Sequence, residues 1–334
     1  MPIAVRSFAK INIGLRIGAA RDDGFHQLLT VYQTIALHDV VRVEVTRGTG
    51  IEVRSRNSKV PQDESNTCYR MAERVLRWLK QRHKVVIQIE KNLPIQGGLG
   101  AASSNAVATL LGLERALKTE IPPDEKLRLA AEVGSDVPLF LLGGTVLGMG
   151  RGEEVYPLAD FRNQAIVVST PAVGISTPKA FRDWDALQEN QENGGAAKAK
   201  LTGQSGSDTM NTFSRSLFAW LMPAMVNGSS TGVSTRGGDR AEAPLLDLVR
   251  AGIANDFERV DYPQHPEMRE VKRVLEGEGA RYASLSGSGS SVYGIFDSQA
   301  AAELAAGNMA AKDVPAQATR TLTRGEYWQQ VFVN

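Results

Sequence analysis

The sequence predicts a protein of two domains in which strands and helices are mixed. Its 334 residues exceed the usual size of a single domain. Strand and helix patterns alternate in the first half, and the character of the chain changes near Arg151. Hydrophobic residues make up 42% of the chain and charged residues 22%, which are ordinary values for a globular protein.

The first half contains three clear strand patterns and three helix patterns. Val40 to Thr46 (VVRVEVT) alternates with a period of two residues, as a half-buried strand does. The helix expected after Pro122 and Pro123 has Asp124 as its N-cap. The strands are expected at residues 4–16, 40–46 and 84–90, and the helices at residues 66–81, 103–117 and 124–133.

The second half has fewer regular patterns. A strand is expected at residues 165–169, a helix at 267–276, a strand-turn-strand unit at 280–296, and a further helix from about Ser298. Residues 188–208 and 227–243 are rich in Gly, Ser, Asn, Ala and charged residues, so we expect mobile loops there. An amphipathic helix is expected between them, at residues 213–225.

Charge and cysteine content exclude several classes of protein. The net charge of +1 gives no general attraction to nucleic acid or to an anionic membrane. Cys68 is the single cysteine, so no internal disulfide forms, and the four histidines have no zinc-site spacing. The longest apolar run, Val137 to Gly148, is shorter than a membrane span, and the first residues lack a signal-peptide layout. We therefore expect a cytoplasmic protein.

Residues 94–111, PIQGGLGAASSNAVATLL, place glycines and serines directly before a helix pattern. The dinucleotide fingerprint fails where Ser103 replaces its third glycine, and the triphosphate P-loop fails because no lysine follows. A tight turn before a capped helix explains the local pattern equally well. A helix start nevertheless offers unpaired N–H groups and a positive dipole end, and small residues let an anion approach. The stretch is therefore a candidate phosphate site.

Charged residues in apolar surroundings mark two further positions. Lys10 and Asn12 are two residues apart on the first strand, so their side chains share a face. A lysine there is costly unless it meets an anion, although an exposed edge strand is an alternative. Asp136 opens the run VPLFLLGG, where a carboxylate either pairs with a cation, does chemistry or caps a helix.

Two other stretches each have a plain structural alternative. Phe25 and His26 offer an aromatic face beside a hydrogen-bonding ring, or simply a packing phenylalanine and a surface histidine. Residues 284–296, SLSGSGSSVYGIF, indicate a turn between two short strands. That turn is either a plain hairpin or one wall of a phosphate site.

The order of these motifs resembles the GHMP kinase superfamily and, within it, the family of 4-diphosphocytidyl-2-C-methyl-D-erythritol kinases. AKINIGL…RDDGFHQL, LPIQGGLGAASSNA, GSDVPLFLLGG…GRGE and LSGSGSSV carry the resemblance, which covers about residues 5–185 and 250–334. It implies a two-domain α+β fold with the active site in the cleft between domains. The N-terminal domain, 1–155, would resemble ribosomal protein S5 domain 2 and hold the ATP phosphate loop. The C-terminal domain, 156–334, would be ferredoxin-like.

The resemblance also implies an activity and a set of functional residues. ATP, with Mg²⁺, would phosphorylate the 2-hydroxyl of 4-diphosphocytidyl-2-C-methyl-D-erythritol in the non-mevalonate route to isoprenoids. Lys10 and Asp136 match the catalytic pair; no metal ligand is assigned. The expected substrate-binding residues are Asn12, Phe25, His26, Phe181, Gly287, Ser288 and Gly289, with Phe25 and Phe181 stacking on cytosine and His26 bonding its edge. The expected ATP-binding residues are Asn66, Lys91, Gly97, Gly98, Leu99, Gly100, Ala101, Ala102, Ser103, Ser104 and Asn105.

Three departures from the family pattern raise questions. Ala101 and Ala102 stand where the family has more glycine and limit backbone freedom, and Phe25 replaces a tyrosine. The stretch at about 188–247 is longer than expected of the family, and the role of this insertion is open. Two alternatives stay open: a GHMP kinase for homoserine, mevalonate or a sugar, and a catalytically silent relative that binds ligand. The expected partner is a small molecule carrying a cytidine diphosphate group, bound by a monomer or weak homodimer, with no nucleic acid or membrane.

Overall fold

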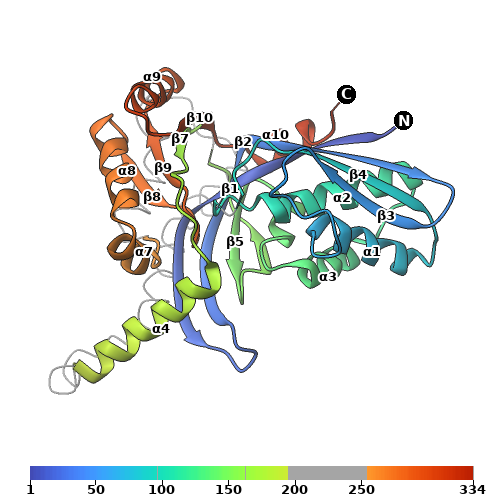
Figure 1. Ribbon diagram of the computed structural model, residues 1–334, viewed down its shortest axis with the longest axis horizontal. Helices are drawn as coiled ribbons and strands as arrows, with labels where there is room; N and C mark the ends of the chain where they lie inside the picture. The colour runs from blue at the N-terminus through green and yellow to red at the C-terminus, as the bar shows by residue number, and fades with distance from the viewer. Residues whose placement is uncertain (96, 162, 195–253, 334) are drawn as a thin grey trace, which may run out of the picture. The chain divides into compact units, whose positions relative to one another are not determined.

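The computed structural model describes residues 1–95, 97–161, 163–194 and 254–333, which form two compact units (Figure 1). Unit 1 comprises residues 1–11, 32–163 and 319–334, and unit 2 comprises residues 12–31 and 164–318. The long strands β1 (Ile3–Ala20) and β2 (His26–Thr46) each contribute residues to both units. For this reason the units do not follow the single predicted boundary after residue 155, which treats the chain as two consecutive pieces.

One sheet has six strands in the order β3-β4-β2-β5-β6, and β1 pairs with β2 off this path. Its other strands are β3 (Gly50–Ser55), β4 (Lys84–Glu90), β5 (Thr145–Met149) and β6 (Glu154–Pro157). Strand β4 is antiparallel to β2 and parallel to β3. The period of two in residues 40–46 is confirmed, because Val41 and Val43 are fully buried while Glu44 is exposed.

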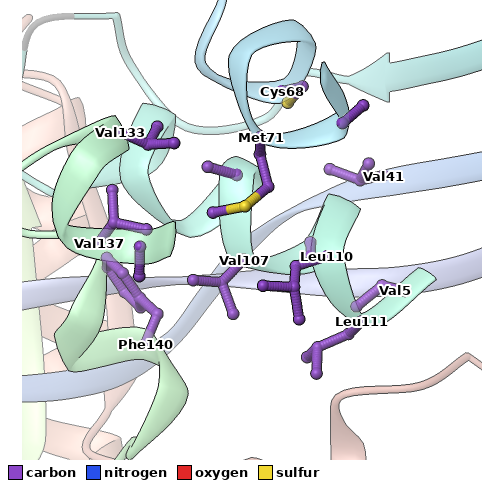
Figure 2. Packing of buried hydrophobic residues seen from close by; sticks show 14 of the residues in the cluster. Val5, Val41, Cys68, Met71, Val107, Leu110, Leu111, Val133, Val137 and Phe140 are labelled. Atoms are coloured by element: carbon purple, nitrogen blue, oxygen red, sulfur yellow. The ribbon is translucent and has the colours of Figure 1, made fainter. Parts of the chain in front are cut away.

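The helices of unit 1 contribute buried residues to the same core as the strands of its sheet. They are α1 (Thr67–Leu79), α2 (Ala101–Leu117), α3 (Pro123–Val133), the 3-10 helix η1 (Pro138–Leu141) and α10 (Arg324–Gln330). Helix α1 packs against both α2 and α3. Figure 2 shows Met71 of α1 meeting Val107 and Leu110 of α2, with Val133 and Phe140 closing the cluster. This packing holds the start of α2 and the turn before η1 in place.

Unit 2 is built on a four-stranded sheet in the order β10-β7-β9-β8. Its strands are β7 (Ala165–Ser169), β8 (Tyr282–Leu285), β9 (Val292–Phe296) and β10 (Ala316–Arg320), the last of which runs into unit 1. Its helices are α4 (Thr177–Gly194), α7 (Glu258–Gln264), α8 (Pro266–Gly277) and α9 (Gln299–Ala310). Helices α8 and α9 pack on β9, as Figure 1 shows.

Two predictions of secondary structure need correction. Pro122, not Asp124, occupies the N-cap of α3, because Pro123 suits the first helical position and places Asp124 in the first turn. Residues 188–194 belong to α4 rather than to a loop, since their Gln and Glu residues extend the helix that begins at Thr177. The rest of the two expected loops and the expected helix at 213–225 lie outside the described residues. Within the described residues, no helix combines the length and apolar character needed to cross a membrane.

Gly112 on α2 packs closely against Val43 of β2, whereas Gly307 on α9 faces open space. A Cβ at Gly112 would lie 2.6 Å from Cγ2 of Val43, whereas a Cβ at Gly307 would meet no atom within 4 Å. Overpacking costs about 1–3 kcal/mol, and replacing glycine by alanine in a helix contributes at most about 1 kcal/mol. We expect Gly112→Ala to lower the melting temperature and the control Gly307→Ala to raise it, as measured by thermal unfolding. A rise in both variants would contradict the packing described here.

Candidate active site

Lys10 and Asp136 form an ion pair in unit 1. Lys10 comes from β1, and Asp136 lies in the turn between α3 and η1, with Nζ 3.3 Å from Oδ2. The lysine side chain is 4% exposed and the aspartate side chain 33% exposed. The two structural alternatives left by the sequence do not hold: the lysine is buried rather than on an exposed edge, and Val137, not Asp136, is the N-cap of η1. A buried cation therefore meets a carboxylate that still reaches solvent.

The glycine-rich stretch forms an uncapped start to α2. Gly100 is the N-cap, with φ +68°, and as a glycine it has no side chain that could cap the first-turn N–H groups. Gly98 also has a positive φ, of +78°. Ala101 and Ala102 already lie in the first turn of α2, where alanine is the best helix former. The left-handed conformations of this stretch fall on Gly98 and Gly100, so its backbone does not need glycine at positions 101 and 102.

The same stretch is hydrogen-bonded to the backbone of Lys10 and lies against its side chain. The backbone N–H of Lys10 donates to the carbonyl of Leu99 at 3.0 Å. A Cβ at Gly100 would lie 2.9 Å from Cζ of Phe140 and 3.0 Å from Cγ of Lys10. Only glycine allows this approach, which brings the lysine side chain against the N-terminus of α2. A cationic side chain and the positive end of a helix dipole thus lie together, as an anion site requires.

A buried carboxylate ties together the residues on either side of this loop. Asp39 of β2 is fully buried and accepts from Nζ of Lys91 and from the N–H groups of Asn92 and Leu93, each at 2.7 Å. Its Oδ2 also accepts from Nδ2 of Asn105 at 3.2 Å. Burial lowers the pKa of Lys91, and the neighbouring Asp39 opposes that shift. The Asp39 side chain thereby holds in place both the segment before the loop, at residues 91–93, and the first turns of α2.

The three residues expected near the base of ATP are all engaged with protein atoms. Lys91 and Asn105 bond to Asp39, and Asn66 caps α1 by accepting from the N–H of Cys68 at 2.8 Å. Nδ2 of Asn66 donates to the carbonyl of Pro61 at 2.6 Å. Among the described residues, Oδ1 of Asn105 is buried without a hydrogen-bond partner. The nucleotide-binding role of these residues stays a prediction.

In unit 2, Asn12 and the late glycine-serine turn are held by specific bonds. Nδ2 of Asn12 donates to Oγ1 of Thr30 at 2.8 Å. The turn between β8 and β9 places Gly287 at φ +64°. Nδ2 of Asn255 donates to the carbonyls of Leu285 and Gly287, at 2.9 and 2.8 Å. The hydroxyl of Ser288 lies 2.8 Å from that of Thr177, at the start of α4, and Gly289 is buried in the same turn.

His26 begins β2 and contacts two residues of α4. Its ring stacks on Phe181, with centroids 5.1 Å apart and planes 14° apart, and its Nε2 lies 2.7 Å from Oδ1 of Asp185. Phe181 also meets Phe257 edge-on. Phe25 is 48% exposed. The histidine is therefore not a surface residue, and the predicted stacking of Phe25 and Phe181 on a base stays a prediction.

Several residues in these networks were not identified from the sequence. Tyr32, Asp39, Asp185 and Asn255 all bond to predicted site residues or to the turns that carry them. Asp39 gave one signal, since it is a charged residue directly before the apolar alternation of residues 40–46. In the described part of the chain, no group of three or more His, Cys, Asp or Glu residues is placed to hold a metal ion.

The sequence matches two family models. Residues 66–144 match the N-terminal domain of GHMP kinases, and residues 241–314 match their C-terminal domain. A 4-diphosphocytidyl-2-C-methyl-D-erythritol kinase from Solibacter usitatus is 34% identical over 294 residues, which cover 87% of this chain and 80% of the relative. One from Moorella thermoacetica is 32% identical over 296 residues, covering 88% and 90%. The chain belongs to the 4-diphosphocytidyl-2-C-methyl-D-erythritol kinase family.

This small-molecule kinase also has the fold expected of the family. A crystal structure of 4-(cytidine 5'-diphospho)-2C-methyl-D-erythritol kinase matches with a TM-score of 0.69 and 27% identity, over 95% of this chain and 98% of that one. Homoserine kinase from Cytophaga hutchinsonii gives a TM-score of 0.67 at 18% identity, over 96% and 95%, which shows the fold alone. The predicted α+β fold of GHMP kinase type is thereby confirmed.

Asp39 offers a test of how the loop of this kinase is held. Asp39→Ala would leave the buried ammonium of Lys91 without its counter-charge, a loss of about 3–5 kcal/mol in the free energy of unfolding. We expect a large fall in chemical-denaturation stability, and a fall also for Asp39→Asn, which keeps the size of the side chain but removes its charge. The control Glu52→Ala breaks solvent-exposed ion pairs with Arg54 and Lys84 and should change stability far less. Equal losses at Asp39 and Glu52 would refute this assignment.

Proposed function

We propose that this kinase transfers the γ-phosphoryl group of ATP to the 2-hydroxyl of 4-diphosphocytidyl-2-C-methyl-D-erythritol, a step of the non-mevalonate route to isoprenoids. The observation that carries the proposal is the ion pair between the buried Lys10 and the partly exposed Asp136, beside a helix start whose N-cap is glycine. It occurs in a chain whose relatives at 30–34% identity bear the name of this enzyme. A silent relative would be expected to lose one member of the pair, so the pair argues against that alternative.

The start of α2 fits the phosphates of ATP. Gly98 and Gly100 leave the backbone open to close approach, and the N-cap Gly100 has no side chain to cap the first-turn N–H groups. Magnesium bound with ATP would neutralise charge on the phosphates, and it favours oxygen ligands. The hydroxyls of Ser103 and Ser104, in the first turn of α2, are oxygen donors of the kind that would hold it.

Phosphoryl transfer requires alignment and charge stabilisation more than covalent help from the protein. Asp136 would orient the acceptor hydroxyl and take up its proton, using the part of its carboxylate that reaches solvent. Lys10 would favour ionisation of that hydroxyl and stabilise the charge that develops on the transferred phosphoryl group. A positioned base of this type contributes about 10²–10⁴-fold to the rate.

The residues of unit 2 supply groups suited to a cytidyl substrate. His26 has a ring that is held in place by Phe181 and Asp185, so it is prepared to bond the edge of a base. Phe25 exposes an aromatic face, and stacking on a base contributes about 1–3 kcal/mol. Hydrogen bonds to the base edge would discriminate against other bases, because a wrong base leaves a buried polar group unpaired.

A coupled assay of ADP release separates this proposal from the other GHMP kinase activities. The purified full chain would be offered 4-diphosphocytidyl-2-C-methyl-D-erythritol, mevalonate or homoserine with ATP and magnesium. The proposal expects turnover with the cytidyl compound and little with the other two. Turnover of mevalonate or homoserine alone would overturn it, as would the absence of turnover with all three.

Asp136→Asn tests the role of the carboxylate. The variant keeps the size of the side chain but loses the charge that accepts a proton. We expect kcat to fall by about 10²–10⁴-fold, while binding of ATP, measured by calorimetry, stays close to that of the wild type. Asp124→Asn, at an exposed position in the first turn of α3, is the matched control. A kcat within a few-fold of wild type in Asp136→Asn would show that another group does this chemistry.

His26→Ala tests recognition of the cytidyl group. Loss of a hydrogen bond to the base should raise KM for the cytidyl substrate while leaving KM for ATP nearly unchanged. The control is His83→Ala, since His83 lies in the connection between α1 and β4 and bonds to Gln81. Steady-state kinetics with each substrate varied in turn provides the measurement. Equal increases in both KM values would refute the assignment.

A further inference from the structure

The second oxygen of Asp136 is held by a residue with no assigned role. The hydroxyl of Tyr32, on β2, donates to Oδ1 of Asp136 at 2.9 Å, while Nζ of Lys10 lies 3.3 Å from Oδ2. The two carboxylate oxygens therefore face different partners. We propose that Tyr32 is a positioning residue of the kinase, which fixes the carboxylate of Asp136 in the orientation needed for phosphoryl transfer. The inference rests on the proposed function for the role of Asp136.

Burial fixes the direction of this hydrogen bond. Tyr32 is 2% exposed. The pKa of Tyr32 is raised well above its usual value. Burial is the largest cause, followed by the neighbouring negative charges of Asp136 and Glu153. The phenol therefore stays protonated throughout the working pH range of an enzyme, and its O–H has to donate. A hydrogen bond to a charged acceptor is stronger than one between neutral groups, so it restrains the carboxylate more firmly.

The same ring also lies beside the catalytic lysine. Nζ of Lys10 is 5.4 Å from the centroid of the Tyr32 ring, within the range of a cation–π contact. Tyr32 thus contacts the cation through its face and the anion through its hydroxyl. A change at this position acts on the geometry of the pair without removing either charge.

The absence of a side chain at Gly152 leaves room for the phenol of Tyr32. Gly152 has φ +105°, and a Cβ there would lie 2.5 Å from the hydroxyl oxygen of Tyr32 and 3.7 Å from Oδ1 of Asp136. Its N–H donates to the carbonyl of Met149 at 2.8 Å, which closes the turn before β6. Gly152 belongs to the GRGE stretch of the family resemblance, to which no chemical role was assigned. The structure supplies a reason for this glycine, because any side chain would push the phenol away from Asp136.

The consequence for catalysis is geometric. A carboxylate without a bond to Oδ1 rotates more freely about its Cβ–Cγ bond, so fewer conformations point it correctly at the acceptor hydroxyl. Misplacement of a reacting group by about 1 Å is enough to cost roughly 100-fold in rate. Because Tyr32 acts through Asp136, its loss should affect the chemical step and not the binding of either substrate.

The decisive variant is Tyr32→Phe, which removes one oxygen atom and keeps the ring beside Lys10. We expect the single-turnover rate and kcat to fall by about 10–100-fold, with KM for ATP and for the acceptor within twofold of wild type. The matched control is Tyr327→Phe. Tyr327 is another buried tyrosine of unit 1, and its hydroxyl donates to the carbonyl of Phe140 at 2.7 Å. It should lose comparable thermal stability and keep its kcat.

A second variant displaces the hydroxyl of Tyr32 instead of removing it. Gly152→Ala should lower the single-turnover rate as Tyr32→Phe does, and the double variant should be no slower than Gly152→Ala alone. The inference is overturned if Tyr32→Phe keeps a single-turnover rate within threefold of wild type. It is also overturned if Tyr327→Phe loses as much rate, because the defect would then reflect general destabilisation. A wild-type protein that turns over a different acceptor would refute the proposed substrate, while the same comparison with that acceptor would still test Tyr32.

Discussion

The ion pair between Lys10 and Asp136 is the interaction on which the rest of unit 1 depends. A buried ammonium group is costly without a counter-charge, so β1 and the turn before η1 have to be fixed relative to each other. The contact of Gly100 with the Lys10 side chain then places the start of α2 beside this cation. The hydrophobic cluster in Figure 2 supplies the rigidity, because α2, α3 and η1 all contribute to it. The chemistry of the kinase follows from this arrangement of backbone and charge.

Much of this arrangement was predictable from local patterns. Alternating apolar residues predicted β4 with its observed bounds, and the charges at Lys10 and Asp136 were conspicuous because their neighbours are apolar. The candidate phosphate site was predictable from small residues before a helix. The failed P-loop match was informative as well, since the cation at this loop comes from Lys10, far away in the sequence. Family membership followed from the order of four motifs, each of which was ambiguous alone.

The supporting residues were not predictable, because their partners lie far away along the chain. Tyr32 and Asp136 are 104 residues apart, and Asp39 and Asn105 are 66 apart. In the sequence, Tyr32 is one more aromatic residue of an apolar strand, with nothing to indicate that its hydroxyl meets a carboxylate. The sequence of β1 and β2 did not indicate that each strand contributes residues to both compact units. The sequence alone also did not indicate that the left-handed residues of the loop are Gly98 and Gly100, while Ala101 and Ala102 belong to α2.

The central claim is that Lys10 and Asp136 act as one unit in phosphoryl transfer. A double-mutant cycle on the single-turnover rate tests it most directly, using Lys10→Met, Asp136→Asn and the double variant with the cytidyl substrate. If the pair acts as a unit, the double variant should be no more than a few-fold slower than the slower single variant. If the two rate losses instead multiply, the residues act independently, and this account of the site would be contradicted.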